Sequence, residues 1–119
     1  MLFICYPKCT TCQKAQKYLN ARGAAYTLRN IKEDNPSREE LAAWHAKSGL
    51  ELRRFFNASG LQYRALDLKN RLPGMSEEEM LNLLAADGML VKRPLLITED
   101  GVLVGFKEPQ WDAALSYGK

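Results

Sequence analysis

Several features are scarce in this chain of 119 residues, and each scarcity excludes a class of protein. No apolar run approaches the roughly 20 residues that a membrane-spanning helix needs. The N-terminal run MLFICY is interrupted by Pro7 and Lys8 too soon for a signal peptide. The net charge of +3 is far from the strongly basic balance of a dedicated nucleic-acid binder. We therefore expect a cytoplasmic protein that contacts neither membrane nor nucleic acid directly.

Metal-ligating residues are equally scarce, with one histidine and three cysteines. An odd cysteine count argues against a disulfide framework, so any disulfide should be transient and chemical. A zinc site would need His45, far along the chain from the cysteines, and the sequence holds no second C-x-x-C. The spacing C-x3-C-x2-C from Cys5 looks like the iron–sulfur signature of radical enzymes, but those need larger barrels. We expect neither a metal nor an organic cofactor.

What is present is an ordinary globular composition, with 46% apolar and 26% charged residues, and a length that suits one domain over residues 1–119. Residues 2–6 read as a buried strand ending at Pro7. Thr10 or Thr11 can then cap a helix to about residue 21, and residues 25–30 read as a second strand. This order predicts a βαβ unit with parallel strands.

Helical patterning then takes over and defines an insertion at approximately residues 36–89. Two capping boxes, Ser37 with Glu40 and Ser76 with Glu79, each open a helix. Two shorter helices are expected between them, one carrying Leu52, Phe55 and Phe56 and the other carrying Tyr63, Leu66 and Leu68. Residues 95–98 and 102–105 flank a glycine-containing turn and predict a hairpin, followed by a helix from about residue 109. The sequence thus predicts an α/β fold, β-α-β then β-β-α, with a four-stranded mixed sheet and helices on both faces.

The motif Cys9-Thr10-Thr11-Cys12 stands where the first strand gives way to the first helix. Unpaired N–H groups and the dipole at a helix N-terminus favour a thiolate, and Lys8 adds positive charge. Cys9 is the candidate nucleophile. Cys12, one turn further, is placed to attack a mixed disulfide on Cys9 and release the bound group.

The segment Lys92-Arg93-Pro94 precedes the third strand. Arg93 could present a bidentate guanidinium to an anionic sulfur or oxyanion over Cys9, or belong to an exposed basic pair. Pro94, at the start of a strand, could be cis. The spacing alone leaves these alternatives open.

Three segments together, 6–15 (YPKCTTCQKA), 92–95 (KRPL) and 104–106 (VGF), resemble the arsenate reductase and Spx superfamily. The resemblance covers the whole chain and implies a thioredoxin-like fold with a helical insertion after the second strand. It implies that Cys9 is the nucleophilic or redox-sensing cysteine and that Arg93 precedes a cis Pro94. Cys12 matches the second cysteine of the Spx-like branch. Arsenate reductases coupled to glutaredoxin generally have another residue at that position.

The resemblance also raises a doubt about arsenate reduction. The reductases place oxyanion-holding arginines in the middle segment and directly after the glycine of the fourth strand. Here Gly105 is followed by Phe106 and Lys107, and the middle stretch 55–60 reads FFNASG. Lys107 offers only a point charge where an arginine would offer a bidentate contact, and the sequence leaves open whether Lys107 reaches the site. We therefore expect those arginines to be missing.

Three functions follow in order of preference. The first is a thiol–disulfide redox protein, with Cys9 attacking, Cys12 resolving, and small thiols or a glutaredoxin- or thioredoxin-type protein as reductant. The second is an Spx-like regulator whose disulfide controls docking on RNA polymerase. Seven basic and four acidic side chains between residues 38 and 73 could contribute to that contact, or form a solvated face. The third is arsenate reduction with external thiols.

Overall fold

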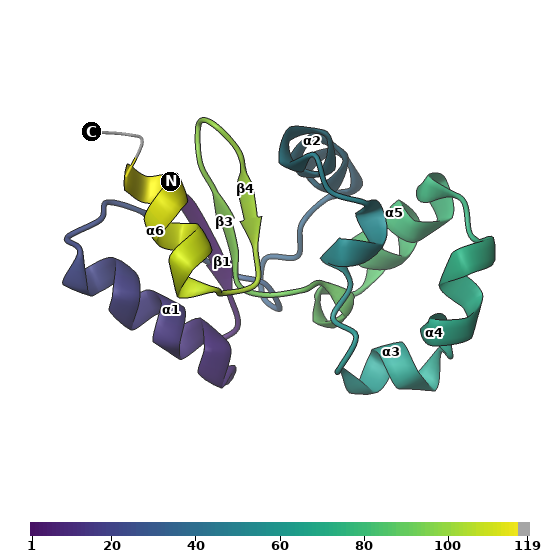
Figure 1. The fold of residues 1–119 in the computed structure, drawn as a ribbon. Helices are drawn as coiled ribbons and strands as arrows, with labels where there is room; N and C mark the ends of the chain where they lie inside the picture. The colour runs from purple at the N-terminus through teal and green to yellow at the C-terminus, as the bar shows by residue number, and fades with distance from the viewer. Residues whose placement is uncertain (117–119) are drawn as a thin grey trace.

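The computed structural model describes residues 1–116, and a four-stranded mixed sheet stands at its centre (Figure 1). The strands are β1 (Leu2–Cys5), β2 (Thr27–Asn30), β3 (Leu95–Ile97) and β4 (Val102–Val104), in the order β2-β1-β3-β4. β1 pairs with β2 in parallel, and β3 is antiparallel to both β1 and β4. The predicted α/β fold is confirmed, with each strand one or two residues shorter than expected.

Alternation along the central strands builds a core on each face of the sheet. In β1, Ile4 joins one cluster while Phe3 and Cys5 join the other. In β3, Leu95 and Leu96 divide between the two clusters in the same way. Successive side chains of a strand point to opposite faces, so two short apolar runs supply both cores.

Two helices that are distant in sequence cover one face of the sheet: α1 (Thr10–Ala21) and α6 (Glu108–Ser116) lie on the same side in Figure 1. Trp111 of α6 is fully buried there, and its indole N–H donates to the Gly105 carbonyl at 3.1 Å. Ala15 and Leu19 of α1 pack into the same cluster. The last strand and the last helix are thereby fixed beside α1.

The predicted insertion lies between β2 and β3 and forms the helical half of the molecule in Figure 1. Both capping boxes are present, at Ser37 with Glu40 and at Ser76 with Glu79. The insertion comprises the α-helices α2 (Arg38–Ser48), α3 (Leu61–Ala65), α4 (Leu68–Arg71) and α5 (Glu77–Ala86), with the 3-10 helices η1 (Leu52–Phe55), η2 (Leu72–Gly74) and η3 (Gly88–Leu90).

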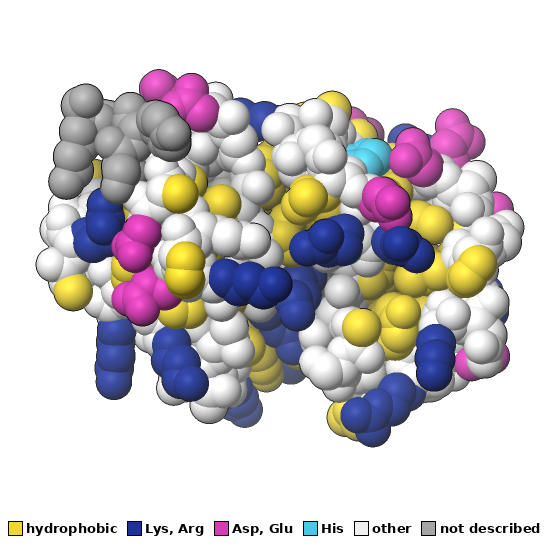
Figure 2. Space-filling model, in the orientation of Figure 1, with side chains coloured by type: hydrophobic (Ala, Val, Ile, Leu, Met, Phe, Trp, Pro, Cys, Tyr) yellow, Lys and Arg dark blue, Asp and Glu magenta, His cyan; other side chains and the backbone are white. Residues whose placement is uncertain are grey.

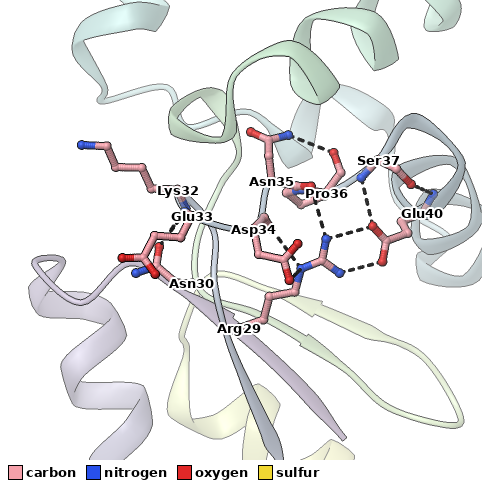
Figure 3. Close-up of polar contacts among 9 residues, drawn as sticks. All are labelled: Arg29, Asn30, Lys32, Glu33, Asp34, Asn35, Pro36, Ser37 and Glu40. Atoms are coloured by element: carbon pink, nitrogen blue, oxygen red, sulfur yellow. Dashed lines mark hydrogen bonds and ion pairs between the residues drawn. The ribbon is translucent and has the colours of Figure 1, made fainter.

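Arg29 of β2 ties this insertion to the sheet (Figure 3). Its guanidinium forms a bidentate pair with the Glu40 carboxylate, at 2.6 and 2.9 Å, and its Nε lies 3.3 Å from the Asp34 carboxylate. The Glu40 carboxylate also accepts the Ser37 backbone N–H at 3.0 Å. The hydrogen bonds from Arg29 hold the pKa of Glu40 at about 2, below its ordinary 4.5. One carboxylate therefore caps α2 and anchors it to β2.

Two local expectations are wrong. Neither Thr10 nor Thr11 caps α1; Cys9 occupies that position, because the turn after Tyr6 brings the Cys9 carbonyl to accept the Gln13 N–H at 3.0 Å. The helix expected around Tyr63 to Leu68 is broken at Asp67, whose backbone is left-handed at φ 52°. The closing helix was expected to finish the chain, and residues 117–119 lie outside the described residues.

No helix within residues 1–116 has both the length and the apolar character that crossing a membrane requires.

Candidate functional site

Cys9 lies at the junction of β1 and α1, where its thiol is partly exposed. The turn that follows β1 is closed by the Cys9 N–H, which donates to the Tyr6 carbonyl at 2.9 Å. Because Cys9 is the N-cap residue, its side chain stands beside the unpaired N–H groups of the first helical turn. The positive end of the α1 dipole lies at this position.

Cys12 lies beneath Cys9 in the same helical turn and is almost completely buried, with 1% of its surface exposed. Its sulfur accepts the Tyr6 backbone N–H at 3.3 Å, and it lies in the same buried cluster as Cys5. The neighbouring Cys5 thiol and the burial together raise the pKa of Cys12. In the reduced protein Cys12 is therefore a buried, protonated thiol.

A cavity of about 490 Å³ opens over Cys9, and we call it the redox pocket. It is formed where the sheet half meets the helical insertion, and Figure 2 shows Lys and Arg side chains gathered around the hollow between the two halves. Its lining residues come from four segments: Cys9 and Thr11; Arg53, Arg54, Phe56, Asn57, Ala58 and Ser59; Lys92 and Arg93; and Val104, Gly105, Phe106 and Lys107.

The charged residues that line the redox pocket are all cationic. Arg53 and Arg54 come from η1, Lys92 and Arg93 from the loop before β3, and Lys107 from the loop after β4. Arg53 also pairs with Glu51 at 2.7 Å, which lies outside the lining. Cations grouped around a half-enclosed nucleophile attract anions and stabilise negative charge that forms there.

Arg93 is held rigidly at the wall of this pocket. Its Nη1 donates to the carbonyls of Met89 and Val91, at 3.2 and 3.3 Å, and its guanidinium stacks over the Tyr6 ring at 5.5 Å. Its buried Nε has no hydrogen-bond partner among the described residues. A guanidinium fixed by two carbonyls and an aromatic face can meet an anion without first being ordered.

The other residues predicted from the motif have different positions. Thr11 lines the redox pocket, whereas Lys8 is exposed and is not among the lining residues, so the positive charge expected from Lys8 comes from elsewhere. The Arg93–Pro94 peptide bond is cis, and Pro94 is buried, with its carbonyl accepting the Gly105 N–H at 2.8 Å. That bond joins the ends of β3 and β4 next to the pocket.

Sequence reasoning missed much of the helical side of the pocket. The expectation that the middle segment supplies no arginine to the site is wrong, because Arg53 and Arg54 directly precede the stretch 55–60 and line the cavity. Lys107 also lines it. The sequence signal for these two residues is an Arg-Arg pair followed by the aromatic pair 55–56. The same local pattern also occurs on a solvated face, so it does not identify a pocket.

The residues weighed for metal binding do not converge. His45 packs edge-on against Phe55, with ring centroids 6.1 Å apart, and its Nε2 lies 3.9 Å from the Glu77 carboxylate. Within residues 1–116 no three His, Cys, Asp or Glu side chains are grouped so that they could hold a metal ion.

A βαβ unit, an antiparallel hairpin and a final helix, with a cysteine at the N-terminus of α1 facing a cis-proline loop, define a thioredoxin-like protein. Residues 5–114 match the model of the ArsC family. The chain belongs to the ArsC family.

Comparison with individual proteins agrees with that assignment. The chain is 53% identical over 112 residues to the uncharacterised protein YusI of Bacillus subtilis, covering 94% of this chain and 95% of that one. A crystal structure of an ArsC family-related protein from Bacteroides fragilis superposes with a TM-score of 0.92 at 54% identity, covering 94% of each chain. The global transcriptional regulator Spx of Streptococcus mutans is 27% identical, over 92% of this chain and 78% of that one.

Proposed function

We propose that this protein is a thiol–disulfide redox protein that acts on anionic partners, with Cys9 as nucleophile and Cys12 as resolving cysteine. The observation that supports it most is the pairing of a partly exposed Cys9, at the mouth of a cationic pocket, with a buried Cys12 in the first turn of the same helix. An incoming disulfide meets Cys9 first. Cys12 is shielded from direct reaction and is close enough to react second.

The reaction has two exchange steps. The Cys9 thiolate attacks one sulfur of the partner disulfide, the partner S–S bond breaks, and one half leaves as a thiolate. The Cys12 sulfur then attacks Cys9 Sγ, and the second half leaves as a thiolate that takes up the proton Cys12 gives off. A Cys9–Cys12 disulfide remains. Small thiols or a glutaredoxin- or thioredoxin-type protein would reduce it and complete the cycle.

The pocket residues have separate roles in this scheme. Arg93, held by the Met89 and Val91 carbonyls, stabilises the anionic sulfur that attacks or is released. Arg53, Arg54, Lys92 and Lys107 hold the carboxylates or other anionic groups of the partner. Thr11 and Phe106 shape the walls on the sheet side. No metal or organic cofactor takes part in either step.

Turnover with oxidised glutathione, an anionic disulfide, and dithiothreitol as reductant tests the scheme. The wild-type protein should turn over repeatedly, and Cys9→Ser should be inactive. In the absence of dithiothreitol, Cys12→Ser should stop after one exchange, with one glutathione attached to Cys9 by mass spectrometry, whereas wild type should release both halves and hold a Cys9–Cys12 disulfide. If Cys12→Ser turns over as fast as wild type, Cys12 has no resolving role and a single-cysteine mechanism replaces the scheme.

A second candidate function is regulation by docking on RNA polymerase, as the similarity to Spx indicates. The observation that favours it is a second groove, of about 580 Å³, in the helical insertion. Arg53 and Arg54 line both this groove and the redox pocket, so a change at Cys9 is adjacent to a surface suited to a protein partner. Its apolar lining consists of Leu52, Tyr63, Leu72, Pro73, Met75 and Met80.

Pull-down of bacterial RNA polymerase by the reduced and the oxidised protein distinguishes the two functions. Docking that depends on redox state and is lost in Arg54→Glu would favour the regulator. Arsenate reduction with external thiols is the third candidate, and the placement of Arg53 and Arg54 supports it more than the sequence did. In that reaction Cys12→Ser should keep its activity, whereas Arg93→Ala should lose it.

A further inference from the structure

Cys5 is a third thiol that the proposed exchange does not use, and it lies against the resolving cysteine. It is the last residue of β1, and 3% of its surface is exposed. Cys12 is 1% exposed in the same core cluster. The Cys12 sulfur accepts the N–H of Tyr6, the residue after Cys5, at 3.3 Å, which places that sulfur over the end of β1.

The contacts put the three thiols in a fixed order. Cys12 shares one buried cluster with Cys5, and Cys9, one helical turn before Cys12 and partly exposed, packs against that cluster. Cys12 is therefore the central member, with Cys9 at the pocket and Cys5 in the core.

We propose that Cys5 and Cys12 form a second redox pair, which takes over the disulfide from Cys9 and Cys12 and returns Cys9 to its thiol form at the pocket. The proposal rests on the proposed function for the first disulfide. The Cys5–Cys12 disulfide stores the oxidised state inside the chain. Cys9, the nucleophile, stays reduced and accessible after the chain has been oxidised.

The transfer is a thiol–disulfide exchange with no net oxidation. The Cys5 sulfur attacks Cys12 Sγ, a Cys5–Cys12 bond forms, and the Cys9–Cys12 bond breaks. Cys9 leaves as a thiolate and takes up the proton that Cys5 releases. Exchange requires the attacking and leaving sulfurs on opposite sides of the central one, a requirement that the placement of Cys5 in the core and of Cys9 at the pocket suits.

The position of Cys9 favours this direction of transfer. The Cys9 sulfur leaves at the N-terminus of α1, at a partly exposed position next to the cations of the redox pocket. Cys5 lies in an apolar cluster with Phe3, Leu96 and Trp111. Forming the disulfide at Cys5 removes an ionisable group from the core and leaves the free thiol at the pocket.

The tryptic map of the chain separates the two disulfides. Cleavage after Lys8 and Lys14 places Cys5 in peptide 1–8 and both Cys9 and Cys12 in peptide 9–14. A Cys9–Cys12 disulfide stays within one peptide, whereas a Cys5–Cys12 disulfide joins two. The experiment is to oxidise the folded protein with diamide, alkylate it in the native state with iodoacetamide, then digest it without reduction.

The proposal predicts that oxidised wild-type protein yields joined peptides 1–8 and 9–14, with the alkyl group on Cys9 by fragmentation. Cys9→Ser should form the joined product at least tenfold more slowly, because the oxidant enters through Cys9. If oxidised wild type holds only the disulfide within peptide 9–14 and takes up no iodoacetamide, the second pair is refuted while the first disulfide stands. Joined peptides at an undiminished rate in Cys9→Ser refute the transfer from Cys9.

Removal of Cys5 separates this proposal from the one on which it rests. Cys5→Ala and Cys5→Val, with circular dichroism to confirm the fold, should both retain the disulfide within peptide 9–14 and lose the reactive surface thiol after oxidation. Two side chains are used because either alone could disturb the core beside Phe3. If neither folded variant forms a Cys9–Cys12 disulfide, the proposed function fails and the second pair fails with it.

Discussion

The anchor between Arg29 and Glu40 offers the most quantitative prediction, because it holds the helical half of the redox pocket to the sheet. Glu40→Gln removes the charge but keeps the side-chain shape and an oxygen to accept the Ser37 N–H. The wild-type carboxyl has its pKa lowered from 4.5 to about 2, chiefly by the hydrogen bonds from Arg29. This difference between the two pKa values, converted at about 1.36 kcal/mol per pH unit, sets an upper bound of about 3 kcal/mol on what the ionised Glu40 contributes to the free energy of unfolding.

Solvent reduces that bound, because the Glu40 side chain is 38% exposed and water screens its charge. We expect Glu40→Gln to lower the free energy of unfolding by about 1–2 kcal/mol at pH 7. For a chain of this length, that corresponds to a fall in Tm of about 4–8 °C. Urea unfolding followed by the fluorescence of buried Trp44 and Trp111 measures it directly.

The pH dependence has a definite sign. The folded-state pKa of Glu40 lies below the unfolded value, so its contribution is complete above about pH 4.5 and is lost as the pH falls toward 2. The difference between wild type and Glu40→Gln should therefore shrink over that interval. Glu39→Gln, which removes an acid from the same helical turn, is the matched control and should cost about 0.5 kcal/mol or less. Equal losses in both variants, or a difference unchanged at pH 2.5, would refute the reasoning.

The remaining predictions concern the pocket and the core. Reversing both pocket arginines, Arg53→Glu with Arg54→Glu, should slow the reaction of Cys9 with the dianionic reagent 5,5′-dithiobis(2-nitrobenzoate) by about tenfold, with little change for neutral 4,4′-dithiodipyridine, in stopped-flow kinetics. The control Arg64→Glu, which lies outside both grooves, should leave both rates unchanged; an equal fall for both reagents would contradict an electrostatic role. Trp111→Ala should cost about 3–5 kcal/mol in urea unfolding, because the indole is fully buried and donates to Gly105, and a loss under 1 kcal/mol would show that α6 contributes little to the fold. Gly88→Ala should destabilise the chain, since an added Cβ would lie 2.4 Å from the Ile31 carbonyl oxygen, whereas Gly74→Ala, with open space around it, should be tolerated; equal Tm values would contradict that close approach.

The elements that follow from local rules were predictable from the sequence. The alternation of Phe3, Ile4 and Cys5 defines β1 and assigns its two faces, and both capping boxes place helix starts correctly. The C-x-x-C motif was correctly expected at a strand-to-helix junction, between β1 and α1. Such features depend on residues a few positions apart, so one sequence contains them fully.

The helical wall of the pocket could not be predicted, because it depends on how the insertion folds back. Arg53 and Arg54 belong to a 3-10 helix of four residues, too short to show a hydrophobic period. Their position follows from pairing that only the folded chain shows: Phe56 bridges to Val91, and the Lys92 N–H donates to the Phe55 carbonyl at 2.7 Å. Lys8 is next to Cys9 in sequence, but its side chain is exposed and is not among the lining residues of the pocket, which closeness in sequence cannot show.

The central claim is that Cys9 and Cys12 form a reversible disulfide that exchanges with partner thiols. The most direct test is the reduction potential of this pair, from mass spectrometry of alkylated protein equilibrated in glutathione buffers of graded potential. In Cys5→Ala, peptide 9–14 reports the Cys9–Cys12 disulfide without interference from Cys5. The account predicts a reversible disulfide with a potential above about −300 mV, the range of exchanging rather than structural disulfides. Two free thiols in peptide 9–14 across all buffers, in wild type and in Cys5→Ala alike, would contradict it.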